Sequence, residues 1–228
     1  MGFDEPSAEE APLTDRKDAG RRLAPRLEPY RGASPLILGI PRGGVPVGFE
    51  IARSLRAELD VLLVRKVGAP GDPEYGLGAV AEDGIVVVDE RRARAAGTSR
   101  AQLEPVVRAE LEEIADRARR FRGGRPSPRY EDRTVVVVDD GVATGGTVEA
   151  GLAVLRARRP REVVVALGVA PPEAIARLRR LADDVVVALV PPFLEAVGQW
   201  YREFDPVDDR EVVRLLEAAR EWRAATAA

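Results

Sequence analysis

Short runs of apolar residues alternate along this chain with longer stretches that have the periodicity of helices. The strand-like runs span residues 35–40, 61–64, 79–88, 135–138, 163–169 and 185–190. Several of them lead into helix-like stretches, which cover residues 44–57, 144–157 and 172–181. Strands that alternate with helices of this length predict right-handed βαβ units. The expected fold is therefore α/β, with a central parallel sheet and helices on both of its faces.

The pattern also predicts elements outside these units. The turn Glu82-Asp83-Gly84 interrupts the third run, so residues 85–88 are expected to form the second arm of a hairpin. Apolar residues at helical spacing predict further helices over residues 99–121 and 208–224. Thr14 is a suitable cap for a first helix that ends near Glu28, although a proline at position 25 disfavours it.

Length and composition set the expected domain organisation. With 228 residues, the chain is long enough for one α/β domain with appendages. We expect a disordered tail over residues 1–12, an α/β core over residues 13–190 and a C-terminal appendage over residues 191–228. Apolar residues make up 45% of the chain and aromatic residues only 5%, so aliphatic side chains must fill the core. Such a core suits strands that are buried on both faces.

Composition also excludes several kinds of chemistry. The chain has no cysteine and no histidine, which excludes thiolate nucleophiles, histidine metal sites and imidazole acid–base catalysis. Its net charge of -3 gives no general attraction to nucleic acid or to anionic membranes. The sequence contains no apolar run of the roughly 18 residues that a membrane span needs, and its acidic start is unlike a signal peptide. A cytoplasmic protein without nucleic-acid or membrane partners is expected.

The most informative segment runs from Val135 to Thr147. Four consecutive valines predict a strand that is buried on both faces, and Asp139 and Asp140 follow it directly. In an open α/β sheet, ligands bind beyond the carboxyl ends of the strands. The next residues are small or hydroxylated and lead into a helix, where glycines and free N–H groups favour a bound phosphate. The segment therefore predicts a phosphate site beside two acids.

Carboxylates repel phosphate, so the two acids need an explanation. A ligand that carries hydroxyl groups next to its phosphate would explain them, because carboxylates accept from a ribose diol and bind Mg²⁺. Other phosphate-binding loops fit less well. A Walker A loop requires a lysine that is missing here, and the Gly-x-Gly-x-x-Gly pattern of dinucleotide-binding turns is absent from this segment. A glycine-containing turn with two solvated aspartates is the alternative.

This segment resembles the signature of type I phosphoribosyltransferases, and its Ala-Thr-Gly-Gly-Thr ending is most similar to adenine phosphoribosyltransferases. The resemblance implies that Asp139 and Asp140 contact the ribose of phosphoribosyl pyrophosphate and hold Mg²⁺ through its hydroxyls or through water. It implies a 5′-phosphate loop formed by Ala143, Thr144, Gly145, Gly146 and Thr147. Hypoxanthine–guanine enzymes carry an aspartate where this chain has Ala143, so their mechanism does not fit. The resemblance covers residues 35–190 and implies a variable hood over the site.

Two other loops match the family in the expected order. Arg42, Gly43 and Gly44 follow the first strand and match the Arg-Gly pattern of the pyrophosphate loop, which often contains a strained or cis peptide. Arg65 and Lys66 resemble the Arg-Lys pair that opens the flexible loop of adenine phosphoribosyltransferases. The Gly- and Pro-rich stretch that follows is typical of a mobile lid. A surface turn and a solvated strand end are the alternatives for these two loops.

Two other features have simpler interpretations. Seven arginines lie between Arg117 and Arg133, where a solvated surface at a helix end is expected. Aromatic residues gather between Phe193 and Phe204, where Trp200 or Tyr201 could stack on an acceptor base in the hood, pack in the core or form a dimer contact.

The sequence therefore predicts an enzyme that transfers a 5-phosphoribosyl group between 5-phosphoribosyl 1-diphosphate and a nitrogenous acceptor. Lys66, Asp139 and Asp140 are its expected catalytic residues, Mg²⁺ is its expected cofactor, and family resemblance implies a homodimer. The alternatives are a non-catalytic sensor of phosphoribosyl pyrophosphate and a phosphotransferase that uses the same loop. The missing P-loop lysine disfavours the phosphotransferase.

Overall fold

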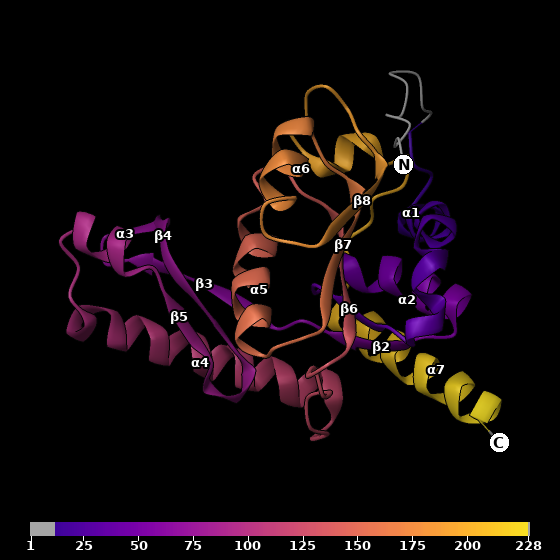
Figure 1. Cartoon of the computed structure of the whole chain (residues 1–228), viewed down its shortest axis with the longest axis horizontal. Coiled ribbons are helices and arrows are strands. Elements are labelled where there is room, and N and C mark those ends of the chain that lie inside the picture. The colour runs from indigo at the N-terminus through magenta and orange to yellow at the C-terminus, as the bar shows by residue number, and fades with distance from the viewer. Residues whose placement is uncertain (1–11, 228) are drawn as a thin grey trace.

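The computed structural model describes residues 12–227, so the predicted tail over residues 1–12 lies almost entirely outside it. A five-stranded parallel sheet forms the centre of the protein, in the order β2-β1-β6-β7-β8 (Figure 1). Its strands are β1 (Leu36–Gly39), β2 (Glu58–Val61), β6 (Thr134–Gly141), β7 (Glu162–Val169) and β8 (Asp184–Leu189). The predicted α/β fold with a parallel sheet is confirmed.

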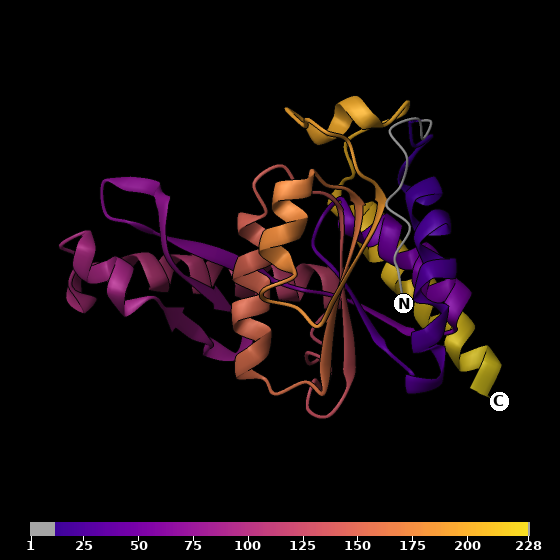
Figure 2. The same ribbon diagram turned by 45° about the horizontal axis from the view of Figure 1, so that its top comes forward.

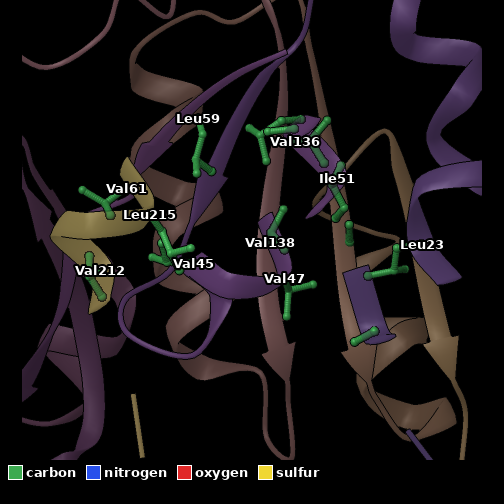
Figure 3. Close-up of a cluster of buried hydrophobic side chains, with 14 of the residues drawn as sticks. Leu23, Val45, Val47, Ile51, Leu59, Val61, Val136, Val138, Val212 and Leu215 are labelled. Carbon is green, nitrogen blue, oxygen red and sulfur yellow. The ribbon is translucent and has the colours of Figure 1, made fainter. Parts of the chain in front are cut away.

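The four valines of β6 explain why the sheet is covered on both faces. Side chains alternate along a strand, so neighbouring valines face opposite sides. Val136 and Val138 pack in a cluster with α1, α2 and α7 (Figure 3), whereas Val135 and Val137 pack in a second cluster with α5 and α6. These helices are α1 (Arg16–Leu23), α2 (Gly44–Leu55), α5 (Gly146–Ala157), α6 (Pro172–Leu178) and α7 (Asp209–Ala227). A strand buried in this way reads as a continuous apolar run.

The chain between β2 and β6 forms an arm that projects from the core (Figures 1 and 2). The arm contains an antiparallel sheet in the order β3-β4-β5 and a long helix, α4, that packs against β3 and β4. Its elements are β3 (Val64–Ala69), β4 (Asp72–Ala81), η2 (Glu82–Gly84), β5 (Val86–Val88), α3 (Glu90–Ala95) and α4 (Arg100–Arg122). The predicted hairpin and the helix over residues 99–121 are confirmed, whereas α3 was not predicted.

Two predictions about this region are wrong in detail. Residues 61–64 are not one strand, because β2 ends at Val61 and β3 begins at Val64. The stretch after Arg65 is not an irregular loop. It continues as β3 and β4 around a tight turn at Pro70 and Gly71, and hydrogen bonds between the strands satisfy backbone groups that a loop would leave to water.

The N-terminal helix also differs from the prediction. Its cap is Asp15, whose side chain accepts from the N–H of Asp18, and Thr14 precedes this cap. The α-helix ends at Leu23, and a 3-10 helix, η1 (Ala24–Ala33), follows. Pro25 lies at the start of η1, where its missing N–H costs little.

The C-terminal segment has two parts. Residues 191–207 include η3 (Val197–Trp200), and Tyr201 forms an isolated parallel bridge with Leu13. The helix α7 then contacts α2, α4 and β2, with an apolar face in the same cluster as α2 (Val212, Leu215, Leu216 and Ala219). The division of the chain at residue 190 stays a prediction. Within the described residues, none of the helices combines the length and the hydropathy that crossing a membrane would require.

A buried group of charges fastens the arm to the core. The Arg122 side chain at the end of α4 is 1% exposed and forms ion pairs with Asp60 of β2, at 2.8 Å, and with Glu82 of η2. It also donates to the carbonyl oxygen of Val61 at 3.0 Å. Burial raises the pKa of both acids, and Arg122 partly offsets this effect. The prediction of a solvated arginine surface is therefore wrong for Arg122.

We predict that Arg122→Ala destabilises the protein by about 3–5 kcal/mol, because it leaves two buried acids without their cation. Urea unfolding measures this change in the free energy of unfolding. Arg119→Ala is the matched control on the same helix, since the Arg119 side chain is 69% exposed, and its effect should stay within about 0.5 kcal/mol. Equal losses in the two variants would contradict the structural role of Arg122.

Candidate active site

The carboxyl ends of β1 and β6 lie at the point where the order of the strand connections reverses. The chain leaves β1 for β2 on one side, while β6 pairs with the other side of β1. Connections that diverge in this way leave a crevice between the two strand ends, where α/β proteins bind ligands. The Ile40 N–H donates to the carbonyl oxygen of Val138 at 2.8 Å and so holds the loop after β1 beside β6.

Two glycines allow this loop to lie against the end of β6. A Cβ on Gly44 would be 2.3 Å from the carbonyl oxygen of Val138, and one on Gly43 would be 2.0 Å from the Asp140 carboxylate. A larger residue at Gly44 would push the loop away from the backbone of β6, and one at Gly43 would displace the Asp140 carboxylate. The Pro41–Arg42 peptide is cis, as the family resemblance implied. The predicted pyrophosphate loop and the predicted ribose acids are therefore in direct contact.

Asp140 belongs to a hydrogen-bonded group on the α1 side of the sheet. Its carboxylate accepts from Arg16 Nε at 2.7 Å, and its carbonyl oxygen accepts from the Tyr201 hydroxyl. The Arg16 guanidinium also stacks on the Phe204 ring at 3.8 Å and donates to the carbonyl oxygen of Asp205 at 2.7 Å. Asp140 is thus paired with a cation, and the Tyr201 hydroxyl links the segment after β8 to the end of β6.

Asp139 has a different environment. It is partly buried, and its carboxylate accepts from the N–H of Asp140 at 2.9 Å. Burial raises the pKa of Asp139 well above its usual value, and the neighbouring charge of Asp140 raises it further. Asp140 therefore pairs with the cation of Arg16, whereas the carboxylate of Asp139 accepts from a backbone N–H.

The predicted 5′-phosphate loop lies at the start of α5. Gly145 has a left-handed backbone with a φ of 77° and precedes the helix without a side-chain cap, which leaves the first N–H groups of α5 available to an anion. Ala143, Thr144 and Thr147 are exposed around it. This arrangement can bind a phosphate through backbone N–H groups and hydroxyls.

A cation from α6 braces this loop. Arg177 Nη2 donates to the carbonyl oxygen of Thr144 at 2.7 Å, and Arg177 Nε pairs with Glu149 in the first turn of α5 at 3.3 Å. Glu149 competes with a bound anion for the positive end of the helix. Arg177 offsets this competition and fixes the loop.

The two basic residues of the predicted flexible loop lie in different places. Lys66 lies over the 5′-phosphate loop, since its Nζ is 3.7 Å from the point that a Cβ on Gly146 would occupy. Arg65 instead pairs with Glu110 at 2.6 Å and Glu113 at 3.2 Å on α4. Hydrogen bonding to Glu110 raises the pKa of Arg65. Lys66 is therefore placed beside the predicted phosphate loop, whereas Arg65 is fixed to the arm.

A cavity of about 590 Å³ joins the three loops. Pro41, Lys66 and Thr147 each line it, so segments far apart in the sequence share one space. The helix α4 forms another wall with Val106, Glu110, Ile114 and Arg117. Arg42 lies in an adjoining pocket and is 3.8 Å from Asp209. Among the described residues, the lining of the 590 Å³ cavity does not include Asp139 or Asp140.

Sequence reasoning missed several residues of this region. Arg16 is 124 positions from Asp140, and nothing in its local sequence indicates the contact. Arg117 was assigned to a solvated surface. Arg177 could have been suspected, because α6 follows the strand next to β6 and starts at the same edge of the sheet.

We predict that Asp139→Asn stabilises the ligand-free protein above neutral pH by on the order of 1 kcal/mol. A carboxyl whose pKa is raised in the folded state lowers stability as pH rises from its usual value of 3.8 through the folded value. Asparagine lacks this penalty and can still accept from the Asp140 N–H. Urea unfolding at pH 5 and pH 8 should show a larger gain at pH 8. A gain in stability that does not grow with pH would contradict a raised pKa of Asp139.

Comparison with known proteins identifies the family. A family model described as "Phosphoribosyl transferase domain" matches residues 13–192. Proteins from two strains of Mycobacterium tuberculosis, both named "Putative phosphoribosyl transferase", are 46% identical over 205 residues. That match covers 90% of this chain, and the chain spans about half (46%) of the length of these relatives.

A solved structure is also similar. The crystal structure of TT1426 from Thermus thermophilus has 46% sequence identity and a TM-score of 0.83, and the match covers 90% of this chain and 97% of that chain. The family match extends over the sheet, the arm and the three loops. The chain belongs to the phosphoribosyl transferase family.

Proposed function

We propose that this protein transfers a 5-phosphoribosyl group between 5-phosphoribosyl 1-diphosphate and a nitrogenous base or related acceptor. One observation carries the proposal. Gly43 of the loop after β1 lies against Asp140, Gly44 lies against the backbone of β6, and Lys66 of the arm lies over the start of α5. In this proposal, these three segments serve as the pyrophosphate loop, a ribose-binding acid and the 5′-phosphate loop for one ligand.

In the proposed reaction, the bond between ribose C1′ and the diphosphate oxygen breaks, and its electron pair leaves with the diphosphate. The lone pair of the acceptor nitrogen forms the new C1′–N bond, and the acceptor loses a proton. No covalent enzyme intermediate is needed, which suits a chain without cysteine or histidine. The groups that matter are those that hold the ribose and balance the charge of the leaving group.

Each part of the site has a role in this proposal. The N–H groups of Gly146 and Thr147 and the hydroxyl of Thr147 bind the 5′-phosphate. Asp139 and Asp140 accept hydrogen bonds from the ribose hydroxyls. When the ribose binds, the Asp140 carboxylate must give up its hydrogen bond from Arg16. Arg42 and Lys66 balance the charge of the leaving diphosphate.

The two acids fit a magnesium ion that is held jointly with the substrate. Mg²⁺ keeps several waters and binds through one or two carboxylates together with substrate phosphates. Among the described residues, no group of three or more His, Cys, Asp or Glu side chains is placed to hold a metal ion. Asp139 and Asp140 offer two carboxylates at the end of β6 and would hold the ion through ribose hydroxyls or water. When bound, the ion would neutralise charge on the diphosphate.

Release of pyrophosphate tests the proposal. The protein is incubated with phosphoribosyl pyrophosphate, magnesium and a panel of purine, pyrimidine and smaller nitrogenous acceptors. We expect one acceptor class to give turnover that stops when the metal is chelated. Binding of phosphoribosyl pyrophosphate without turnover of any acceptor would favour a sensor, and absence of binding would refute both functions.

Two substitutions separate binding from turnover. Asp140→Asn should weaken the binding of phosphoribosyl pyrophosphate by roughly 10- to 100-fold, the size expected when a charged hydrogen-bond acceptor is lost. Lys66→Ala should lower kcat by about 100-fold or more while KM changes little, if Lys66 acts on the leaving group. Lys17→Ala is the control, because Lys17 is the other lysine of the chain and lies exposed on α1. Equal kcat values for the two lysine variants would remove Lys66 from the mechanism.

The contacts of Arg177 with Thr144 and Glu149 give a separate prediction. Arg177→Ala should raise the KM for phosphoribosyl pyrophosphate by about 10-fold and leave kcat within about 3-fold, because it frees the carbonyl of Thr144 and the charge of Glu149. Arg177→Lys should recover part of the loss. Arg179→Ala is the matched control, since Arg179 is exposed two residues further along the chain. A fall in kcat with unchanged KM would contradict a role in phosphate binding.

A further inference from the structure

A second, smaller pocket adjoins the 590 Å³ cavity. It has a volume of about 260 Å³ and is lined by Pro41, Arg42, Arg117, Arg120, Phe121 and Asp209. These residues come from the loop after β1, from the last third of α4 and from the first residue of α7. Three guanidinium groups therefore meet one carboxylate in a single concave space.

The charges in this pocket are unbalanced. The Asp209 carboxylate pairs with Arg120 through one oxygen and lies 3.8 Å from Arg42 Nη1 through the other. Arg117 pairs with Glu113 at 2.8 Å, and Glu113 also pairs with Arg65 at 3.2 Å. Asp209 is thus shared by two cations, whereas Arg65 also pairs with Glu110, so that Glu113 is chiefly the partner of Arg117. A further anion would be attracted here, because arginine binds phosphate oxygens in the same forked geometry as carboxylates.

The pocket shares two lining residues with the cavity that joins the three loops. Pro41 and Arg117 line both spaces. Pro41 and Arg42 bring the loop after β1 to this boundary, so a diphosphate bound by that loop could extend into the smaller pocket. Arg42, Arg117 and Arg120 line the smaller pocket, and their guanidinium groups suit the terminal phosphate of that diphosphate.

We propose that α4 supplies Arg117 and Arg120 as additional binding residues for the terminal phosphate of the substrate's diphosphate. The identity of this ligand rests on the proposed function. Asp209 holds Arg42 and Arg120 in place in the ligand-free protein and competes with the phosphate for them. The arm therefore contributes to substrate binding through α4 as well as through Lys66.

Titration of inorganic pyrophosphate into the full chain by calorimetry tests this assignment. Arg117→Gln and Arg120→Gln should each weaken pyrophosphate binding by about 10-fold, since each removes one charge-assisted contact. Arg119→Gln and Arg108→Gln are matched controls, because they remove the same charge from α4, where Arg119 pairs with Asp116 and Arg108 with Glu104. The controls should change the affinity by less than about 2-fold. Equal affinities for Arg120→Gln and Arg119→Gln would overturn the proposal.

Asp209→Asn should change the pyrophosphate affinity in the opposite direction to the arginine variants. A misfolded variant would not bind pyrophosphate more tightly. Removal of the competing carboxylate should tighten pyrophosphate binding by a few-fold, and weaker binding would contradict the assignment. Phosphoribosyl pyrophosphate should compete with pyrophosphate for the site. Simultaneous binding of both would show that the pocket serves a separate anionic effector and would overturn the substrate assignment.

Failure of this inference and failure of the proposed function can be told apart. If the wild-type protein releases pyrophosphate from phosphoribosyl pyrophosphate but all arginine variants bind pyrophosphate equally, the assignment of Arg117 and Arg120 is wrong and the function stands. If no acceptor gives turnover and phosphoribosyl pyrophosphate does not bind, the function fails. Dependence of pyrophosphate binding on Arg117 and Arg120 would then still support an anion site.

Discussion

The close approach of the loop after β1 to the end of β6 is the constraint on which the rest of the site depends. Gly43 and Gly44 lie so near to Asp140 and Val138 that a Cβ at either position would collide with them. This approach follows from the strand order, because β1 and β6 are neighbours whose connections leave in opposite directions. The sheet thereby places the loop after β1 beside the end of β6, although the two segments lie about 100 residues apart in the chain.

The arm adds the third side of the site, and its position depends on a few buried contacts. Arg122 joins α4 to β2 through Asp60 and to η2, the turn between β4 and β5, through Glu82. Such buried ion pairs cost much when one partner is removed, even where their net contribution to stability is small. Their value here is geometric. They fix the end of α4, so that Arg117 and Lys66 face one cavity.

Internal ion pairs occupy the charged groups of the ligand-free site. Arg16 pairs with Asp140, Arg177 with Glu149, and Arg42 and Arg120 share Asp209. A sugar phosphate would exchange these partners for its own hydroxyls and phosphates, without exposing an isolated charge to a low-dielectric site. Asp139 differs because it is partly buried beside another acid, which raises its pKa.

Local periodicity and short motifs were enough to predict the parallel α/β fold and the family. Four valines predicted a strand covered on both faces, and glycines beside two acids predicted a turn that a phosphate and a sugar can approach. The pairing of Arg16 with Asp140, the burial of Arg122 and the position of α4 beside the cavity became visible in the folded chain alone. The physical reason is that an arginine's burial and partner depend on contacts between segments distant in sequence, and a charged residue reads the same in the chain whether water or a buried carboxylate surrounds it.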